Sequence, residues 1–186
     1  MVKSDYYSSI SKGYDELYKE EQLKKLKLIL KNVKIKGRVL DVGCGTAFYS
    51  KYFQDYTGID NSKGMLEKAR ANVLYGRAEK LPFKDKSFDV VICLTAIHNF
   101  KDYKKALNEM KRVSKKLIII SLLKKTKKFN EIKRNINDMF KDIKKLNEEK
   151  DLIFIINQTS WMDYLNVLLL LLLYLNFFVM VDQKTV

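Results

Sequence analysis

The sequence predicts an α/β fold in which a seven-stranded, mostly parallel sheet carries helices on both faces and ends in a β-hairpin. The first observation is that short apolar runs alternate with helical runs between residues 38 and 122. The second is that the apolar runs are unbroken, as in FDVVICL at residues 88–94. Unbroken apolar strands are typical of a parallel sheet that is buried on both faces. With 186 residues, of which 47% are hydrophobic, the chain has enough material for one good core.

The elements follow one another in strand–helix order after an amphipathic N-terminal helix. That helix is expected from Tyr14 to Leu30, with a solvated basic face, and ends by Gly37. We expect strands at 38–42, 56–59, 73–76, 88–94 and 117–122. Helices are expected at 48–53, 63–71, 104–113 and 127–139. Runs at 140–146 and 151–157 flank the polar turn 147–150 and predict the closing hairpin.

These elements divide the chain into an N-terminal helical lid at 1–36, a core at 37–157 and an apolar tail at 158–186. The tail departs sharply in composition, since residues 161–181 contain no Lys or Arg and a single acid, Asp163. A membrane anchor is one interpretation, because about 17 apolar residues approach the length of a membrane-spanning helix. An aberrant extension of the reading frame and a segment packed on the domain or on another subunit are the alternatives.

The charge of the chain is strongly basic, with a formal net charge of +14 and a pI near 9.6. Such a charge favours phosphate-rich partners, because neutralising phosphates releases counterions. However, Lys outnumbers Arg about six to one, whereas base and phosphate recognition favours the planar Arg fork. A lysine-rich solvated surface, as in a heat-adapted protein, therefore remains an alternative.

The cysteines and the N-terminus bear on the compartment of the protein. Cys44 and Cys93 lie in apolar stretches, and His98 is the only histidine. This set predicts neither a zinc site nor a disulfide framework and favours a reducing cytoplasm. Residues 1–11 are polar and Tyr-rich, which is unlike a secretory signal.

The strongest chemical signal is the segment 39–47, VLDVGCGTA, in which an apolar strand runs into a two-glycine turn. Glycine allows the backbone to approach a nucleotide-like ligand closely. A phosphate-binding turn would require a glycine at position 48, where this chain has Phe48, and Asp41 stands two residues before Gly43. An acid beside the turn predicts a ligand that is cationic at this end.

Two further elements follow in the order expected of a nucleoside-binding site. Asp60 closes the next strand, 19 residues after Asp41, where its two oxygens could accept both ribose hydroxyls. Residues 76–79, GRAE, precede Pro82, the only proline, which stiffens a loop suited to flank an adenine ring.

With these motifs, residues 14–157 resemble the class I S-adenosylmethionine (SAM)-dependent methyltransferases, whose fold is Rossmann-like. The likeness is greatest to the small branch that contains ubiquinone- and menaquinone-type enzymes and tRNA wobble-uridine enzymes. The resemblance implies that Asp41, Gly43 and Gly45 line the methionine end of SAM and that Asp60 holds the ribose, with Cys44 and Asn61 also among the cofactor-binding residues. It also implies that Met65, Ala78 and Glu79 meet the adenine and that Leu94 lies beneath the sulfonium. Ala47 departs from the glycine common in relatives, which is tolerated unless the turn needs a positive φ there.

Catalytic candidates are His98 and Tyr14. His98 follows the fourth strand, where the resemblance places the substrate pocket, and could orient or deprotonate an acceptor; a loop histidine with a structural role is the alternative. Tyr14 stands where related enzymes cover the cofactor with an aromatic residue; simple helix packing is the alternative. Because methyl transfer depends mainly on positioning, neither a metal nor a catalytic triad is expected.

The leading functional hypothesis is methyl transfer from SAM to a small-molecule or RNA acceptor. The basic charge leans toward RNA, although neither arginine-rich segments nor clear stacking platforms are present. A non-catalytic SAM sensor or partner subunit is the alternative, which the cofactor motifs leave open. A nicotinamide-dependent oxidoreductase is disfavoured by Asp41 and Phe48. We expect a cytoplasmic protein, with membrane contact through residues 161–181 if the tail is an anchor.

Overall fold

The computed structural model of the chain describes residues 14–158 and 169, with side chains from Tyr18 onward. The strands are β1 (Arg38–Val42), β2 (Asp55–Asp60), β3 (Val73–Tyr75), β4 (Phe88–Leu94), β5 (Ser114–Leu123), β6 (Ile143–Asn147) and β7 (Asp151–Asn157). The helices are α2 (Tyr14–Asn32), α3 (Lys63–Leu66), α4 (Tyr103–Val113) and α5 (Phe129–Met139), with 3₁₀ turns η1 (Ser50–Tyr52) and η2 (Ile97–Asn99).

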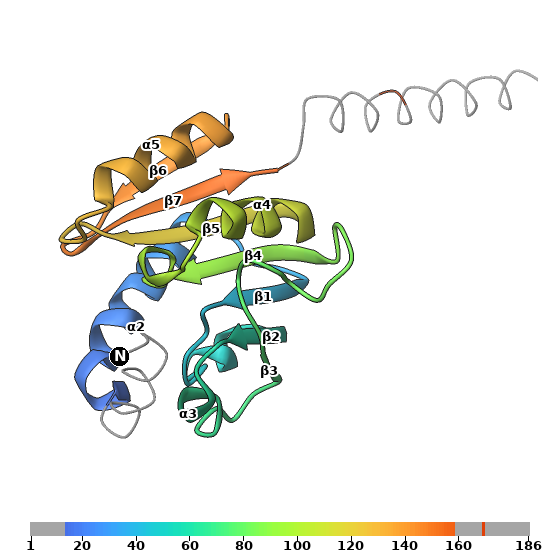
Figure 1. Cartoon of the computed structure of the whole chain (residues 1–186), viewed down its shortest axis with the longest axis vertical. Helices are drawn as coiled ribbons and strands as arrows, with labels where there is room; N and C mark the ends of the chain where they lie inside the picture. Colours follow the sequence, from blue (N-terminus) through green and yellow to red (C-terminus); the bar gives the residue numbers. More distant parts are fainter. Residues whose placement is uncertain (1–13, 159–168, 170–186) are drawn as a thin grey trace, which may run out of the picture.

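The strands form one seven-stranded sheet in the order β3-β2-β1-β4-β5-β7-β6. The first five are parallel to their neighbours, whereas β7 is antiparallel to both β5 and β6. The predicted mostly parallel sheet with a closing hairpin is thus confirmed (Figure 1). The strand order reverses between β1 and β4, and in open α/β sheets ligands bind beyond the carboxyl ends of the strands at such a point.

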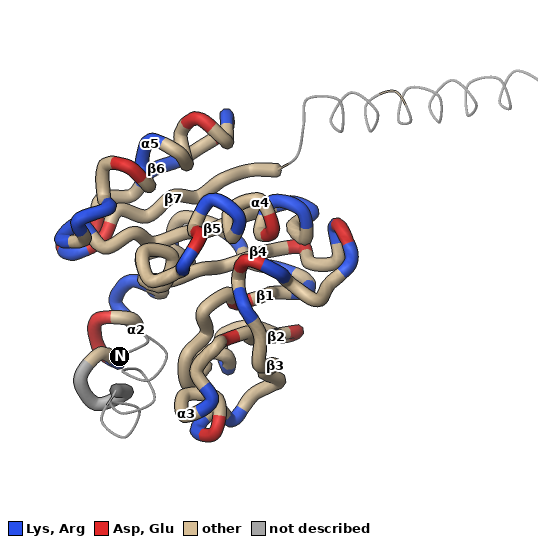
Figure 2. The backbone as a smooth tube through the Cα atoms, viewed as in Figure 1, with Lys and Arg blue, Asp and Glu red and all other residues tan. Residues whose placement is uncertain are grey.

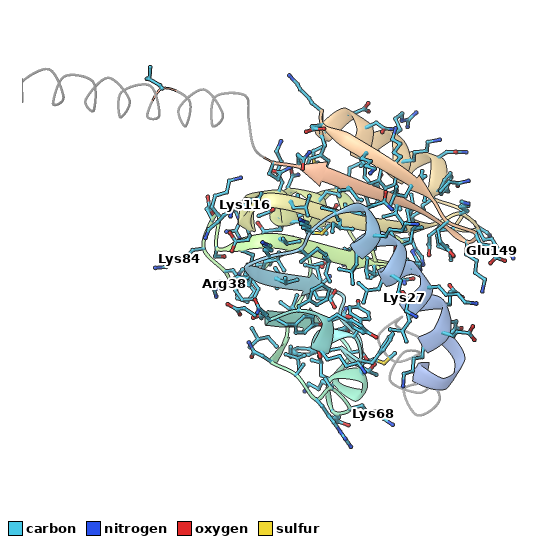
Figure 3. All side chains as sticks on the ribbon, turned by 180° about the vertical axis from the view of Figure 1, so that it is seen from behind. Lys27, Arg38, Lys68, Lys84, Lys116 and Glu149 are labelled. Carbon is cyan, nitrogen blue, oxygen red and sulfur yellow. The ribbon has the colours of Figure 1, made fainter. Side chains whose placement is uncertain are left out.

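Helices cover both faces of the sheet. On one face α4 and α5 cover the strands (Figure 1). Leu107, Met110 and Ile136 of these helices belong to the core on that face. On the other face Leu26 and Ile29 of α2 pack against β1, β4 and β5 (Figure 3). Because both faces are covered, β4 is buried along almost its whole length, which explains its unbroken apolar sequence.

Two expected helices are much shorter in the structure. Residues 48–53 form only η1, and residues 63–71 form only the four-residue α3. Backbone hydrogen bonds in these segments join residues three apart in sequence. Examples are Tyr52 N to Tyr49 O at 3.1 Å and Lys68 N to Met65 O at 3.1 Å. Such 3₁₀ bonding is common in short connectors. The strand expected at 140–146 also begins later, at Ile143, because Phe140 still bonds to Ile136 as the end of α5.

The basic face expected on α2 is only partly solvated. Lys25 is completely buried and forms an ion pair with the equally buried Asp151 at the start of β7. One turn earlier, Glu21 pairs with Lys150 across 2.5 Å. The helix is therefore held to the β6–β7 hairpin by a buried and an exposed ion pair.

Among the described residues no helix is both long enough and apolar enough to cross a membrane. The segment 161–181, for which a membrane anchor is one interpretation, lies outside the described residues apart from Leu169. The division into lid, core and tail stays a prediction.

Candidate functional site

A cavity of about 610 Å³ lies at the carboxyl ends of β1 to β4, where the strand order reverses. We call it the cofactor cavity. It is lined by Gly43, Gly45, Ile59, Asp60, Asn61, Met65, Tyr75, Gly76, Arg77, Ala78, Glu79, Leu94, Thr95, Ala96, Asn99, Phe100, Lys101 and Lys128. Eight of the ten residues expected to bind the cofactor are therefore brought together around one cavity.

The glycine turn after β1 has a backbone that requires its glycines. Gly43 has a φ of +79° and Gly45 a φ of +56°, which is the left-handed region that disfavours side chains. The turn is tied to β2 because Gly43 N donates to Ile59 O at 2.8 Å. Ala47 also has a positive φ, of +52°. The turn therefore does need a positive φ at the position where relatives commonly have glycine, and alanine is unfavourable there. The cost of an alanine in this region is about 1–2 kcal/mol.

Gly43→Ala is expected to lower the free energy of unfolding by about 1–3 kcal/mol. A Cβ at this position would approach the Ala96 Cβ to 2.6 Å in addition to adopting an unfavourable φ. Gly45→Ala is the matched control, because its added Cβ meets no atom within 4 Å and the variant adds only the backbone strain. Urea unfolding of both variants measures the difference. If Gly45→Ala proves as destabilising as Gly43→Ala, the contact with Ala96 is unimportant.

Asp60 lies at the end of β2 and faces the turn. Its Oδ2 accepts a hydrogen bond from Gly45 N at 2.9 Å, and its Oδ1 accepts one from Ser62 N at 2.8 Å. Burial raises the pKa of this carboxyl, and these backbone bonds partly offset the effect. The two carboxylate oxygens together have about four lone-pair sites, which is more than the backbone bonds from Gly45, Ser62 and Asn61 use. Asp60 thus positions the glycine turn and still offers acceptors to the cavity.

Asp41 and Cys44 are buried and do not line the cofactor cavity. Asp41 is completely buried, accepts a hydrogen bond from the Tyr56 hydroxyl at 2.7 Å, and has its pKa raised by burial to about 7. The Cys44 thiol, whose pKa burial also raises, packs so closely on β2 that a Cβ on Gly58 would lie 2.7 Å from its Sγ. The expected contacts of these two residues with the cofactor stay predictions.

Apolar side chains and Glu79 also line the cofactor cavity. Met65, Ala78 and Leu94 are nearly completely buried and supply apolar surface. Glu79 Oε1 accepts hydrogen bonds from Lys101 N at 2.9 Å and Asp102 N at 3.2 Å. Burial alone would raise the pKa of Glu79, but backbone hydrogen bonds and Arg77 outweigh it and lower the pKa. Glu79 therefore stays ionised.

The catalytic candidates occupy less direct positions. His98 is half-buried on η2, and its neighbours Asn99 and Phe100 line the cofactor cavity. Tyr14 begins α2, but its side chain lies outside the described residues. Any catalytic role for either residue stays a prediction.

Thr95 is the most informative lining residue that sequence reasoning missed. It follows β4 with a φ of +54°, which is unusual for a β-branched residue. Its backbone N donates to Ser121 Oγ at 2.7 Å, and its Oγ1 accepts a hydrogen bond from Lys25 Nζ. No local sequence signal predicts this conformation, because partners from α2 and β5 impose it.

Comparison with known proteins agrees with this geometry. A family model described as a methyltransferase domain matches residues 40–120, which include the glycine turn, Asp60 and β4. The chain is 37% identical over 120 residues to the uncharacterised methyltransferase YcgJ of Bacillus subtilis, covering 54% of this chain and 47% of YcgJ. It is 33% identical over 130 residues to a demethylmenaquinone methyltransferase of Staphylococcus haemolyticus, covering 59% of this chain and 54% of that enzyme.

The chain thus spans about half the length of these two relatives. A solved SAM-dependent methyltransferase from Thermotoga maritima superposes with a TM-score of 0.65 over 86% of this chain and 100% of that one. At 21% identity this likeness supports the fold alone. Together with the glycine turn and Asp60 at one cavity, these matches show that the chain belongs to the class I SAM-dependent methyltransferases.

Proposed function

We propose that this chain transfers a methyl group from SAM, held in the cofactor cavity, to a small-molecule or RNA acceptor. The observation that carries the proposal is the junction of Gly45 and Asp60, where a glycine turn and a carboxylate from different strands are hydrogen-bonded at the rim of one cavity. The family supplies the identity of the cofactor.

The residues of the cavity suit SAM better than a dinucleotide. Asp60 offers acceptors for a ribose diol, and Met65, Ala78 and Leu94 offer an apolar surface for a ring. The Asp60 carboxylate is hydrogen-bonded to the turn and would repel a pyrophosphate there, whereas it would attract an ammonium or a sulfonium. The end of the cavity beside the glycine turn therefore fits the positively charged part of such a nucleoside.

Methyl transfer requires little acid–base chemistry from the protein. The bound cofactor supplies an activated methyl carbon, to which a lone pair of the acceptor bonds while the carbon–sulfur bond breaks and its electron pair returns to sulfur, giving S-adenosylhomocysteine. The acceptor's proton, where one is lost, passes to water or to a nearby base. Thr95, Ala96 and Phe100 form the wall where an acceptor would approach. Their contribution is to hold the two reactants in line and to exclude water.

Calorimetric titration of the full-length protein with S-adenosylhomocysteine tests the cofactor site. We expect saturable binding that Asp60→Ala weakens at least about tenfold, since hydrogen bonds to charged groups contribute about 1.5–3 kcal/mol. Asp55→Ala is the matched control, because Asp55 lies at the other end of β2 and pairs at the surface with Arg38. Thermal unfolding of each variant checks that the fold is retained. Tighter binding of NAD than of S-adenosylhomocysteine would refute the proposal.

Turnover is tested separately with methyl-labelled SAM and two acceptor pools, bulk tRNA and a small-molecule cell extract. Label transferred to either pool supports an enzyme and assigns the class of the acceptor. Binding of S-adenosylhomocysteine without transfer to either pool would favour the non-catalytic SAM-binding alternative.

A further inference from the structure

A second cavity, of about 650 Å³, adjoins the cofactor cavity. We call it the lysine cavity, because six cations line it: Arg77, Lys80, Lys101, Lys104, Lys105 and Lys128. They come from the loop after β3, from the segment before α4 and its first turn, and from the residue that precedes α5. Lys and Arg occur over much of the fold (Figure 2), but here they converge on one concave site.

The two acids of the lysine cavity are already engaged by the protein. Glu79 holds two backbone N–H groups, as described above, and its Oε2 lies 3.4 Å from Arg77 Nε. Asp102 caps α4, since its Oδ1 accepts a hydrogen bond from Lys105 N at 3.0 Å. Neither carboxylate forms an ion pair with a lysine of the cavity within the described part of the chain. The acids therefore organise the walls without neutralising the lysines.

Within the described residues the five lysines form no close ion pair, although Lys105 lies near enough to Glu109 on α4 to help lower the pKa of that carboxyl. Among residues 18–158 none of them lies within 4.0 Å of a carboxylate oxygen, whereas Lys24, Lys116 and Lys150 elsewhere form such pairs. Like charges gathered around one concavity repel each other, and an anion placed among them relieves that repulsion. The first turn of α4 adds the positive end of a helix dipole. The cavity is suited to an anion.

The position of the lysine cavity ties that anion to methyl transfer. Arg77, Lys101 and Lys128 line both cavities, so an anionic group bound here would lie next to the cofactor cavity. Lysines bind phosphate as point charges, without the planar recognition that arginine gives. A phosphate ester on a small molecule carries more charge than a carboxylate, and RNA presents a row of singly charged phosphodiesters that several ammonium groups can neutralise.

We propose that the lysine cavity binds a phosphate group of the methyl acceptor. This inference rests on the proposed function, since it names the chemistry of the acceptor for the same site. The phosphate has two sources, a phosphodiester in RNA and a phosphate ester on a small molecule. Both would place the acceptor atom toward Thr95 and Phe100 while the phosphate stays among the lysines.

The test uses the full-length protein and two triple variants with equal loss of charge. Lys80→Gln, Lys104→Gln and Lys105→Gln remove lysines that line only the lysine cavity. Lys27→Gln, Lys68→Gln and Lys84→Gln remove exposed lysines of α2, the segment after α3 and the loop before β4, labelled in Figure 3. Binding of bulk tRNA is measured as a function of salt, and binding of inorganic phosphate is measured by calorimetry. S-adenosylhomocysteine binding is measured for every protein.

For an RNA acceptor, the cavity variant should bind tRNA at least about tenfold more weakly, and the slope of log K against log salt should fall by about 2, since each phosphate contact contributes about 0.7–0.9. The control variant should keep most of that slope. For a small phosphate ester, the two variants bind tRNA equally, but only the cavity variant loses inorganic phosphate. Equal behaviour of the two variants toward both probes overturns the proposal. Intact S-adenosylhomocysteine binding in that case leaves the proposed function standing.

Discussion

Replacing Lys25 with methionine is expected to lower the free energy of unfolding by about 3–5 kcal/mol, which is the usual cost of leaving a buried charge without its partner. The Lys25 ammonium and the Asp151 carboxylate are both completely buried. Methionine fills the volume of the lysine stem but leaves the buried Asp151 carboxyl without its cationic partner. Because methionine keeps most of the packing of the lysine stem, the loss of stability in this variant reports mainly the loss of the positive charge.

The effect should extend to the cofactor cavity. Lys25 also donates to Thr95 Oγ1, and Thr95 Oγ1 lies 3.1 Å from Ser121 Oγ and 3.3 Å from Asp151 Oδ2. These contacts hold Thr95 in its left-handed conformation at the wall of the cavity. Without Lys25 we expect weaker S-adenosylhomocysteine binding as well as lower stability. The network therefore couples the docking of α2 to the shape of the site.

Two controls isolate the buried charge. Glu21→Gln removes the exposed ion pair with Lys150 on the same helix, and such pairs contribute at most about 1 kcal/mol. The double variant Lys25→Met with Asp151→Leu removes both charges and should recover most of the lost stability, because an apolar pair often replaces a buried ion pair without loss. Urea unfolding of the three variants measures the free energy of unfolding of each and tests this expectation. A loss in Lys25→Met no larger than that in Glu21→Gln would show that the buried pair contributes little.

The sheet was predictable from the sequence because its strands are buried on both faces. Residues 88–94 were expected as a strand and form β4 with the same bounds. A continuous apolar run of this length is buried most completely as a central strand of a sheet covered on both faces. The short connectors were not predictable in this way. Residues 63–71 have a helical composition, but only 63–66 form a helix, because the distance between β2 and β3 sets the length of the connection.

The residues of the site could be predicted where a local sequence motif determines their conformation. They could not be predicted where contacts with residues far away in the sequence determine it. Gly43, Gly45 and Asp60 could be found from spacing alone, and they line one cavity. The sequence pattern predicts that Lys25 is one of several lysines on a solvated helix face. Its burial depends on Asp151, 126 residues further along the chain. Nothing in the local sequence distinguishes Lys25 from the exposed Lys24 or Lys27.

The ionisation of Asp41 should make the stability of the protein depend on pH. Burial raises the pKa of Asp41 to about 7 from an ordinary value of 3.8. Between these two values the folded state holds a proton that the unfolded state has released. The free energy of unfolding therefore falls as pH rises through this range, by about 4 kcal/mol in total, and the contribution of Asp41 levels off above pH 7.

Asp41→Asn removes this titration while keeping an acceptor for the Tyr56 hydroxyl, which donates to Asp41 at 2.7 Å. Between pH 5 and pH 8 the unmodified protein should lose about 2–3 kcal/mol more stability than the asparagine variant, as measured by urea unfolding. Because Asp60 and the other carboxyls titrate in both proteins, the difference between the two pH profiles belongs to Asp41. Parallel profiles would show that Asp41 is ionised throughout this range, and the carboxylate would then be a permanent negative charge next to the glycine turn.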